Sequence, residues 1–206
     1  ILPGKPVRLT HEYRLPTEHT GPASRLADAG DTVPMPQDPQ QDDFDAVIVC
    51  AGLDADSLLR PLGLRLPMAA LPACAITAPL RQLEAHPDLG PRAGLWDELK
   101  QVAISRIGQR VRVAGRDEPL LHEVLHDWFP GAMQSGQLQR WSGRHAMLAD
   151  GMPVIGATEL PGLWLNIAQG DAGWTLACGV ARVLAEQIAG LKPELDVQGL
   201  DITRLA

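Results

Sequence analysis

The sequence predicts a mixed α/β fold in which part of a parallel sheet is joined to an antiparallel sheet with a helix. Three observations predict it. Residues 44–52 are apolar apart from Asp45, and a run that is apolar on both faces is typical of a strand in a parallel sheet. Residues 96–115 alternate like a β-hairpin, and residues 150–190 follow the order strand, glycine-bearing turn and long helix.

Length and composition favour one or two globular domains. The chain has 206 residues, of which 45% are hydrophobic, so it can bury a substantial core. Its net charge of −7 and isoelectric point near 5.3 argue against a nucleic-acid partner, because such a chain does not neutralise phosphates. No stretch reaches the roughly 18 consecutive apolar residues that a membrane-spanning helix needs.

The three cysteines are widely spaced and have apolar neighbours. Cys50, Cys74 and Cys178 are odd in number, which argues against a disulfide framework. We expect buried thiols in a reducing compartment. This predicts a cytoplasmic protein, and peripheral attachment at the inner face of the membrane is left open.

The N-terminal quarter predicts two strand regions separated by a loop. Residues 6–15 alternate loosely and predict one strand or two short ones. Residues 21–43 are rich in Pro, Asp, Gln and Gly and predict a loop or a partly disordered segment. The apolar run at 44–52 predicts a strand buried on both faces, and its terminal Gly52 permits close approach of a ligand.

The middle of the chain predicts an antiparallel sheet with one helix. Residues 66–80 contain three prolines, so only their middle is expected to form a strand, on an edge or interrupted. Residues 96–115 predict a hairpin with Gly108-Gln109 at the turn. Residues 118–128 predict a helix that Pro130 ends.

That helix contains the sequence His122-Glu123-Val124-Leu125-His126, which matches HExxH. In that motif two imidazoles one helical turn apart bind zinc, and the glutamate acts as a base. Here the helix ends soon afterwards and no third ligand is evident in the sequence. We therefore favour two solvent-facing histidines, expect no metal, and keep a zinc hydrolase as a less favoured alternative.

The C-terminal third is the most informative region. An apolar run at 163–167 leads through glycines near 170 into a helix at 174–188, and Gly190 stands where a C-cap glycine belongs. This arrangement presents the N–H groups of a helix N-terminus to an anionic or electron-rich group. An ordinary packing unit would show the same pattern, so the pattern alone leaves both interpretations open.

The residue identities in this region are more specific than the strand–turn–helix pattern alone. It reads DGMPVIG at 150–156, GLW at 162–164 and GDAGWTLACG at 170–179. These segments resemble the C-terminal signature of the bacterial FAD-dependent D-amino-acid dehydrogenases, within the D-amino-acid oxidase and glycine oxidase superfamily. DAVIVCAG at 45–52 and the hairpin at 96–115 are similar to further parts of the same family.

The resemblance implies FAD as cofactor and a set of residues around it. The helix terminus would face the pyrimidine end of the flavin, and its dipole would stabilise an anionic reduced flavin. The cofactor-binding residues that the resemblance implies are Tyr13, Ala51, Gly52, Asp150, Gly156, Gln169, Gly170, Asp171, Ala172, Gly173, Trp174 and Thr175.

The resemblance also implies a substrate site, with two departures from the family. The family usually has Trp-x-Gly-x-Arg-Pro where this chain has WSGRHA at 141–146, and its arginine binds the substrate carboxylate. By position that arginine is His145, with Arg144 one residue earlier, so either Arg144 serves or the carboxylate contact is weaker. Gln169 stands where the family commonly has histidine. Arg144 as an ordinary surface charge also stays open.

The activity that the resemblance implies is the oxidative deamination of a D-amino acid or a similar small amine. Hydride would pass from the substrate to the flavin, and no catalytic residue is assigned because the amine can bind already neutral. The departures at His145 and Gln169 leave a second hypothesis, a non-catalytic remnant or interaction module of the same fold.

The chain contains no Gly-x-Gly-x-x-Gly sequence to hold the pyrophosphate of FAD. We therefore expect a C-terminal portion of a longer enzyme, which is inactive and retains FAD poorly without the N-terminal Rossmann segment. Residues 1–62 and 146–206 would complete the Rossmann-like FAD-binding domain, and residues 63–145 would form an α+β substrate-binding domain on an antiparallel sheet. The substrate, the electron acceptor and the oligomeric state stay open.

Overall fold

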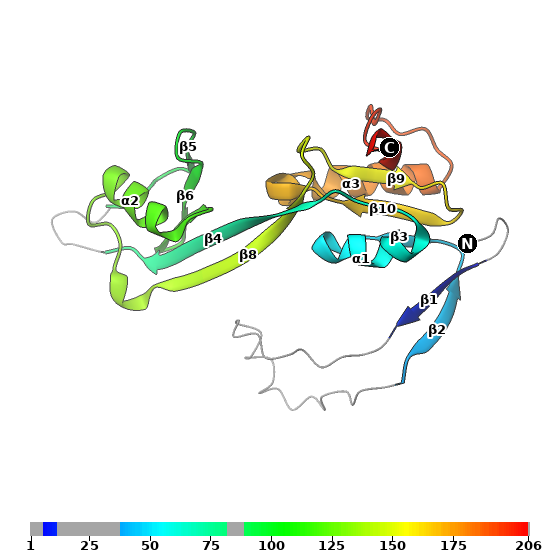
Figure 1. Ribbon diagram of the computed structural model, residues 1–206. Helices are drawn as coiled ribbons and strands as arrows, with labels where there is room; N and C mark the ends of the chain where they lie inside the picture. Colours follow the sequence, from blue (N-terminus) through cyan, green and yellow to red (C-terminus); the bar gives the residue numbers. More distant parts are fainter. Residues whose placement is uncertain (1–5, 12–37, 82–88, 206) are drawn as a thin grey trace. The chain divides into compact units, whose positions relative to one another are not determined.

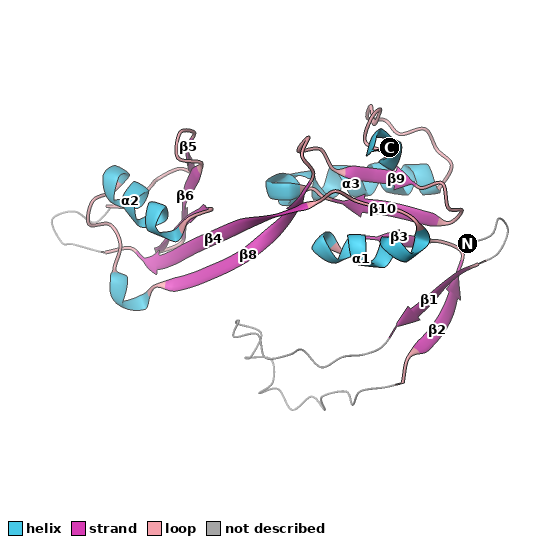
Figure 2. Cartoon of the chain, viewed as in Figure 1, coloured by secondary structure: helices cyan, strands magenta, loops and turns pink. Residues whose placement is uncertain are grey.

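The computed structural model describes residues 6–11, 38–81 and 89–205. The chain divides into two compact units. One comprises residues 1–50, 155–166 and 183–206, and the other comprises residues 51–154 and 167–182. Figure 2 shows helices and strands within each unit, which confirms the predicted α/β class. The predicted domain boundaries, between residues 62 and 63 and between residues 145 and 146, stay a prediction.

The larger unit is built on a five-stranded antiparallel sheet in the order β5-β6-β7-β4-β8, of which Figure 1 labels β4, β5, β6 and β8. Its strands are β4 Ala69–Pro79, β5 Leu95–Asp97, β6 Val102–Ile107, β7 Arg110–Gly115 and β8 Gln139–Met147. Strands β6 and β7 form the predicted hairpin, and Gly108 at its turn has φ +60°. A positive φ favours glycine, which explains this residue at the turn.

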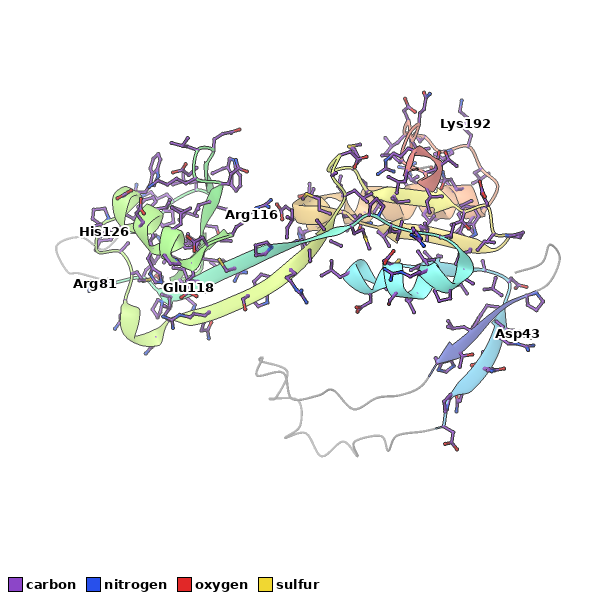
Figure 3. The ribbon with its side chains drawn as sticks, in the orientation of Figure 1. Asp43, Arg81, Arg116, Glu118, His126 and Lys192 are labelled. Carbon is purple, nitrogen blue, oxygen red and sulfur yellow. The ribbon has the colours of Figure 1, made fainter. Side chains whose placement is uncertain are left out.

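One face of this sheet packs under helix α2, Glu118–Trp128. Val102, Ile104, Val111 and Val113 alternate along the hairpin and are at most 2% exposed. They pack in one cluster with residues of α2 that include Leu121. The helix has the predicted bounds and ends just before Phe129 and Pro130, and Figure 3 marks its first residue, Glu118, and its last turn at His126.

Strand β4 corrects the expectation for residues 66–80, because it is an 11-residue central strand rather than an edge strand. It pairs with β7 over Cys74–Pro79 and with β8 over Ala69–Thr77. Among the described strands, Pro72 therefore lies where β8 is the only neighbour of β4, whereas Pro79 pairs with β7 at the end of β4 and its carbonyl accepts from Gln134 N–H at 2.9 Å on the other side. Because a proline lacks one ladder donor, a long strand tolerates it where one side has no strand partner, as at Pro72, or at the end of the strand, as at Pro79.

A short helical segment precedes the sheet. It comprises η3 Gly52–Asp54, α1 Ala55–Leu59 and η4 Arg60–Leu62. Asp56 Oδ1 accepts a hydrogen bond from the backbone N–H of Leu66 at 3.1 Å, and Asp56 pairs with Arg60. The Leu66 N–H first, and the Arg60 guanidinium second, hold the pKa of Asp56 below its ordinary value. These contacts fix the connection from α1 to β4.

The smaller unit contains a three-stranded sheet in the order β3-β10-β9. Strands β3 Val47–Val49 and β10 Leu163–Ile167 pair in parallel, as the apolar run predicted, and β9 is Val154–Ala157. The expectation that the run at 44–52 is buried on both faces is wrong, because Ile48 is 45% exposed. Within the described residues β3 is an edge strand with one neighbour, so it is less covered than β10.

Two further strands of this unit form an antiparallel ribbon, β1 Val7–His11 and β2 Gln40–Phe44. Strand β2 corrects the expectation that residues 21–43 are all loop, because Gln40–Asp43 pair with β1. Arg8 Nε donates to Asp43 Oδ1 at 2.7 Å across the ribbon, and Figure 3 marks Asp43. The turn-forming composition of the segment gave no sign of these pairs, since long-range pairing can override local propensity.

Helix α3, Gly173–Ile188, follows η6 Gly170–Ala172. Val180, Val183 and Leu184 of its predicted apolar stripe are at most 8% exposed. At its C-terminus, Gly190 has φ +71°, and Leu191 N–H donates to Glu186 O at 2.8 Å. These features confirm the predicted glycine cap. The last element is η7 Ile202–Leu205.

The cysteine prediction is half correct. The three thiols are free, but Cys50 and Cys178 are exposed and only Cys74 is partly buried. Apolar neighbours in sequence therefore misled the burial prediction, since exposure depends on which elements cover a segment. Among the helices of the described residues, none combines the length and apolar content needed to cross a bilayer.

Candidate functional site

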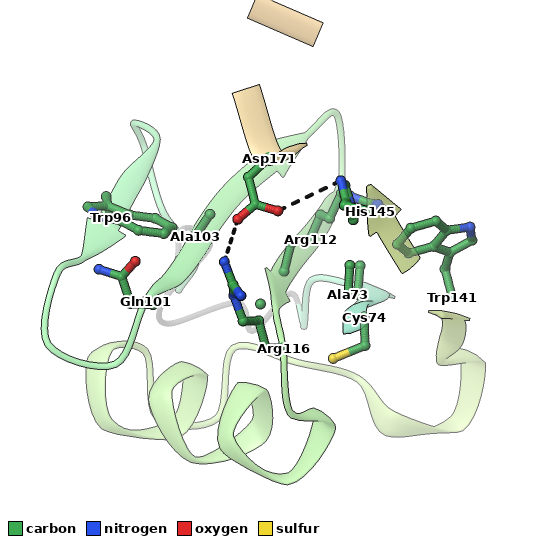
Figure 4. Close-up of a pocket in the computed structure, with 13 residues that line it drawn as sticks. Ala73, Cys74, Trp96, Gln101, Ala103, Arg112, Arg116, Trp141, His145 and Asp171 are labelled. Carbon is green, nitrogen blue, oxygen red and sulfur yellow. Dashed lines mark hydrogen bonds and ion pairs between the residues drawn. The ribbon is translucent and has the colours of Figure 1, made fainter. Parts of the chain in front are cut away.

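A cavity of about 310 Å³ lies on the five-stranded sheet (Figure 4). Its floor is on the face opposite the valine cluster, because side chains alternate along each strand. The floor is made of small residues that pair across neighbouring strands, Ala75 with Ala114 and Ala103 with Ala114. Alanine side chains are too short to fill this space, so the sheet leaves a hollow here.

Two tryptophans line the cavity above this floor. Trp96 of β5 pairs in register with Ala103, and Trp141 of β8 pairs with Ala75. Their side chains are 55% and 48% exposed. A Cβ atom at Gly143 would lie 2.8 Å from Trp141 Cη2, so the indole lies across this glycine. The tryptophans give the cavity apolar sides (Figure 4).

Three polar side chains that line the cavity form a charged group. Arg116, in the loop between β7 and α2, donates from Nη2 to Asp171 Oδ2 at 2.7 Å. His145 Nδ1 lies 3.7 Å from Asp171 Oδ1 and 3.2 Å from Gly170 O. Figure 4 shows these three side chains converging from the β7–α2 loop, β8 and η6. They join the sheet to the turn before α3.

A second arginine, Arg112 of β7, also lines the cavity. Its Nη1 donates to Thr77 Oγ1 at 3.2 Å, on the neighbouring strand β4. Among the residues that the structure describes, no carboxylate pairs with Arg112. Its charge is therefore compensated less than that of Arg116.

The cavity has no activated thiol. Burial raises the pKa of Cys74 above its ordinary value, and the nearby carboxylates of Glu118 and Asp117 raise it further. A protonated thiol is a weak nucleophile. This disfavours covalent chemistry at Cys74.

Backbone strain is concentrated beside the cavity. Of the described residues other than glycine, only Gln101 and Ala168 have positive φ, at 53° and 62°. Gln101 lines the cavity, and Ala168 precedes the turn that carries Asp171. Residues other than glycine adopt this conformation at a cost of about 1–3 kcal/mol, and such strain clusters at functional sites.

The structure separates the two predicted substrate-binding residues. His145 lines the cavity, whereas the exposed Arg144 is not among the residues that line it. Because neighbouring residues of a strand point to opposite faces, Arg144 lies on the other face of β8, in register with Pro72. The structure thus brings His145, and not Arg144, to the cavity.

The predicted cofactor-binding turn lies beside the end of β8. Gln169 forms a β-bridge with Met147, and a Cβ atom at Gly170 would lie 2.6 Å from Met147 Cε. A larger residue there would have to displace the flexible end of Met147, and the φ of +55° at Gly170 is one that glycine adopts without strain. The η3 turn, which contains Gly52 with φ +54°, also contacts β8. The turn at Gly170 and the η3 turn, two segments predicted to bind the cofactor, therefore both lie beside β8.

The start of α3 is open to solvent. The predicted residues Asp171, Ala172, Trp174 and Thr175 are exposed, and Trp174 is 95% exposed. In the described residues, protein side chains do not cover this helix terminus. The N–H groups at the start of the helix therefore favour an anionic group at this position.

The remaining predicted cofactor residues lie elsewhere or are not described. Asp150 Oδ1 accepts a hydrogen bond from Met152 N at 3.0 Å in the turn after β8. Gly156 is in β9 and has φ +127°. Ala51 is half-buried just before η3, and Gly173 begins α3. Tyr13 lies outside the described residues.

The two histidines of the HExxH sequence lie on α2, away from the cavity just described. His122 Nε2 is 3.8 Å from Glu118 Oε1, while Glu123 Oε1 accepts from Lys100 Nζ at 2.7 Å. Within residues 6–11, 38–81 and 89–205, no group of three or more candidate ligand side chains is placed to hold a metal ion. The zinc hypothesis stays untested.

Sequence reasoning missed most of the residues that line the cavity. Trp96, Arg112, Arg116 and Trp141 were not assigned to the site. The alternation in the hairpin gave one available signal, since the face opposite its valines carries Ala103, Arg112 and Ala114. Small and charged residues in that pattern indicate a face that is not packed.

Comparison with known proteins identifies the family. The family model described as DAO, FAD dependent oxidoreductase, matches residues 16–187. D-amino acid dehydrogenase from Cereibacter sphaeroides is 39% identical over 175 residues, which cover 79% of this chain and 39% of that protein. The corresponding protein from Agrobacterium fabrum is 39% identical over 176 residues, covering 79% and 41%. The chain thus spans about two fifths of the length of these curated relatives.

Solved structures share the fold. L-amino acid deaminase from Proteus vulgaris, with its specific insertion deleted, has a TM-score of 0.65 at 22% identity, covering 80% of this chain and 44% of that chain. Glycine oxidase from Geobacillus kaustophilus has a TM-score of 0.64 at 18% identity, covering 81% and 48%. The family match covers most of the chain, and the fold agrees with it. The chain therefore belongs to the family of FAD-dependent oxidoreductases.

Proposed function

We propose that the protein containing this chain oxidises the amine of a D-amino acid or a similar small amine, with FAD as the cofactor that takes the hydride. The substrate Cα would give up its hydride to the flavin, the amine would become an imine, and water would hydrolyse the imine to a carbonyl compound and ammonia. The observation that carries this proposal is the cavity between Trp96 and Trp141, which the Arg116–Asp171 pair joins to the turn before α3. The D-amino acid dehydrogenase relatives support the choice of substrate.

The flavin in this proposal lies against the open start of α3. Gly170, Asp171, Ala172 and Gly173 would line it, and the positive end of the helix dipole would favour an anionic ring. Ala51 and Gly52 would approach it from η3, which contacts the same strand β8. Further contacts are proposed for Tyr13, Asp150, Gly156, Gln169, Trp174 and Thr175.

Chemistry in this site needs no protein base if the amine binds already neutral. His145 is the imidazole in the cavity, but its Nδ1 faces both the Asp171 carboxylate and the Gly170 carbonyl. That position suits orientation of the turn rather than proton removal from a substrate. The chain's own contribution would be to bind the substrate, orient it and exclude water.

The proposal includes a partner segment that binds the pyrophosphate. No Gly-x-Gly-x-x-Gly sequence occurs in this chain, and such a loop at a helix N-terminus is how this class of fold holds dinucleotides. We propose that an N-terminal Rossmann segment supplies it and covers Trp174. In that arrangement residues 1–62 and 146–206 belong to the FAD domain, and residues 63–145 form the substrate domain.

Flavin reduction tests this function. The full-length flavoprotein is mixed anaerobically with a panel of D-amino acids, and absorbance near the flavin maximum is followed. The expected result is bleaching by at least one D-amino acid, with ammonia and a 2-oxo acid as products. The L-enantiomers are the matched control, and dithionite shows that the flavin can be reduced.

A non-catalytic remnant is the second candidate. The observation that favours it is His145, which stands where an arginine would bind the carboxylate and is held by Asp171 and Gly170 instead. Bleaching by dithionite but by no amine would support the remnant and reject the proposed enzyme.

A further inference from the structure

The charges around the cavity do not cancel. Arg116 is paired with Asp171 at 2.7 Å, and His145 lies beside the same carboxylate. Arg112 has only the neutral Thr77 hydroxyl as its hydrogen-bond partner in the described part of the chain. Among the residues that line the cavity, with His145 counted as neutral, two arginines and one aspartate leave one positive charge.

One excess positive charge fits a ligand with one negative charge. A guanidinium recognises a carboxylate through two parallel N–H···O bonds, which an imidazole cannot provide. Arg144 is exposed and lies on the face of β8 away from the cavity, so it is poorly placed for this contact. Arg112 is partly buried beside the alanine floor, where a charge–charge contact is screened less than at an exposed position.

The sides of the cavity fit an apolar group. Trp96 and Trp141 stand over a floor of alanines, and their indoles are only about half covered. The cavity volume of about 310 Å³ equals roughly ten water molecules at about 30 Å³ each. A side chain as small as a methyl group would leave much of this volume and both indoles in contact with water.

We infer that the cavity selects substrates with one carboxylate and a large apolar or aromatic side chain, and that Arg112 is the residue that binds the carboxylate. This inference rests on the proposed function, because it takes the cavity as the substrate site. The carboxylate contacts Arg112, and the side chain lies between Trp96 and Trp141. Arg116 and Asp171 neutralise each other and hold the turn in place.

The test measures binding of ligands that cannot be oxidised, so that it does not depend on turnover. The probes are 3-phenylpropanoate, its neutral amide 3-phenylpropanamide, and propanoate, each titrated into the full-length protein by calorimetry. We expect the phenyl carboxylate to bind at least tenfold more tightly than either of the other probes.

Four single-residue variants test whether Arg112 is the residue that binds the carboxylate. Arg112→Gln should weaken 3-phenylpropanoate binding roughly 10- to 100-fold, as expected for loss of a hydrogen bond to a charged group, and leave the amide unchanged. Arg112→Lys should retain part of the affinity, which separates loss of charge from misfolding. Arg144→Gln makes the same charge change on the other face and should have no effect. Trp141→Ala should weaken the phenyl ligand but not propanoate.

The outcomes separate the inference from the proposed function. Equal affinity for the acid and the amide, or loss of affinity in Arg144→Gln but not in Arg112→Gln, overturns the inference. If D-amino acids bleach the flavin but the probes show no carboxylate preference, only the inference fails. If the probes bind as expected and no amine reduces the flavin, the proposed function fails and the binding site stands.

Discussion

The two faces of the five-stranded sheet are made of alternating residues of the same strands, yet they are built differently. On one face, Val102, Ile104, Val111 and Val113 are almost completely buried under α2. On the other, alanines and Arg112 border a cavity. A sheet can thus fix its shape through one face and leave the other available for a ligand.

The two faces contribute differently to the free energy of unfolding because their side chains differ in size. Fully burying a valine or leucine contributes about 1.5–3 kcal/mol, whereas an alanine has little surface to bury. The residues under α2 therefore hold the sheet together, and the cavity residues contribute little. This separation permits changes in the cavity without loss of the fold.

The largest expected effect is on the packed face. Leu121 of α2 is 0% exposed, and Leu121→Ala should lower the free energy of unfolding by about 2–5 kcal/mol through lost burial and the void that remains. The matched change on the cavity face, Ala103→Ser, should change it by about 0.5 kcal/mol or less. Urea denaturation followed by circular dichroism measures both. Similar losses in the two variants would contradict the contrast between the faces.

Much of the packed face could be predicted from the sequence. The alternation of valines gave the hairpin, Gly108 gave its turn, and Pro130 gave the end of α2. These signals act between neighbours in the chain, where periodicity and turn chemistry determine structure. The central position of β4 could not be predicted in this way, because its partners β7 and β8 are set by long-range packing.

The residues of the cavity face were harder to predict because they are also brought together by long-range packing. Arg116 and Asp171 are 55 positions apart and meet only in the folded chain, and Thr77 is 35 positions from Arg112. Alternation showed that Arg144 and His145 point to opposite faces of a strand, but not which of them faces the cavity. The resemblance located the turn at Gly170, whereas the two tryptophans of the cavity emerged only from the pairing register.

Two glycines allow the packing of the two faces to be compared directly, because a glycine-to-alanine substitution can be made on each face. A Cβ atom at Gly115 would lie 2.9 Å from Leu121 Cδ2 and 3.4 Å from the backbone oxygen of Gln101. Gly115→Ala should cost about 1–3 kcal/mol of stability, since buried Leu121 has no space to move. Gly143→Ala meets the Trp141 ring at 2.8 Å, and this exposed ring can rotate away. Its stability cost should be within about 0.5 kcal/mol.

Thermal unfolding of the two glycine variants measures these costs. A ligand titration adds a second readout, since displacement of Trp141 in Gly143→Ala should weaken binding of 3-phenylpropanoate. If Gly143→Ala destabilised the protein as much as Gly115→Ala, the cavity face would be packed as tightly as the other.

The smallest effect concerns Asp97, which joins the edge of the sheet to α2. Its Oδ1 accepts from Lys100 N–H at 2.9 Å and its Oδ2 from Trp128 Nε1 at 3.4 Å, and it follows the cavity residue Trp96 in β5. The Lys100 N–H first, and the Trp128 N–H after it, hold the pKa of Asp97 below its ordinary value.

Because the pKa is lowered in the folded state, the Asp97 carboxylate stabilises the fold at pH values above the ordinary carboxyl pKa of about 4. This contribution is lost as the pH falls through the folded-state pKa. The difference in Tm between wild type and Asp97→Ala should therefore be largest near neutral pH and shrink in acid. Leu99→Ala is the control, since residue 99 is 92% exposed and carries no titrating group, so its Tm difference should not vary with pH. A constant difference for Asp97→Ala would mean that the ionised carboxylate does not hold β5 to α2, and that the edge bearing Trp96 is fixed by packing alone.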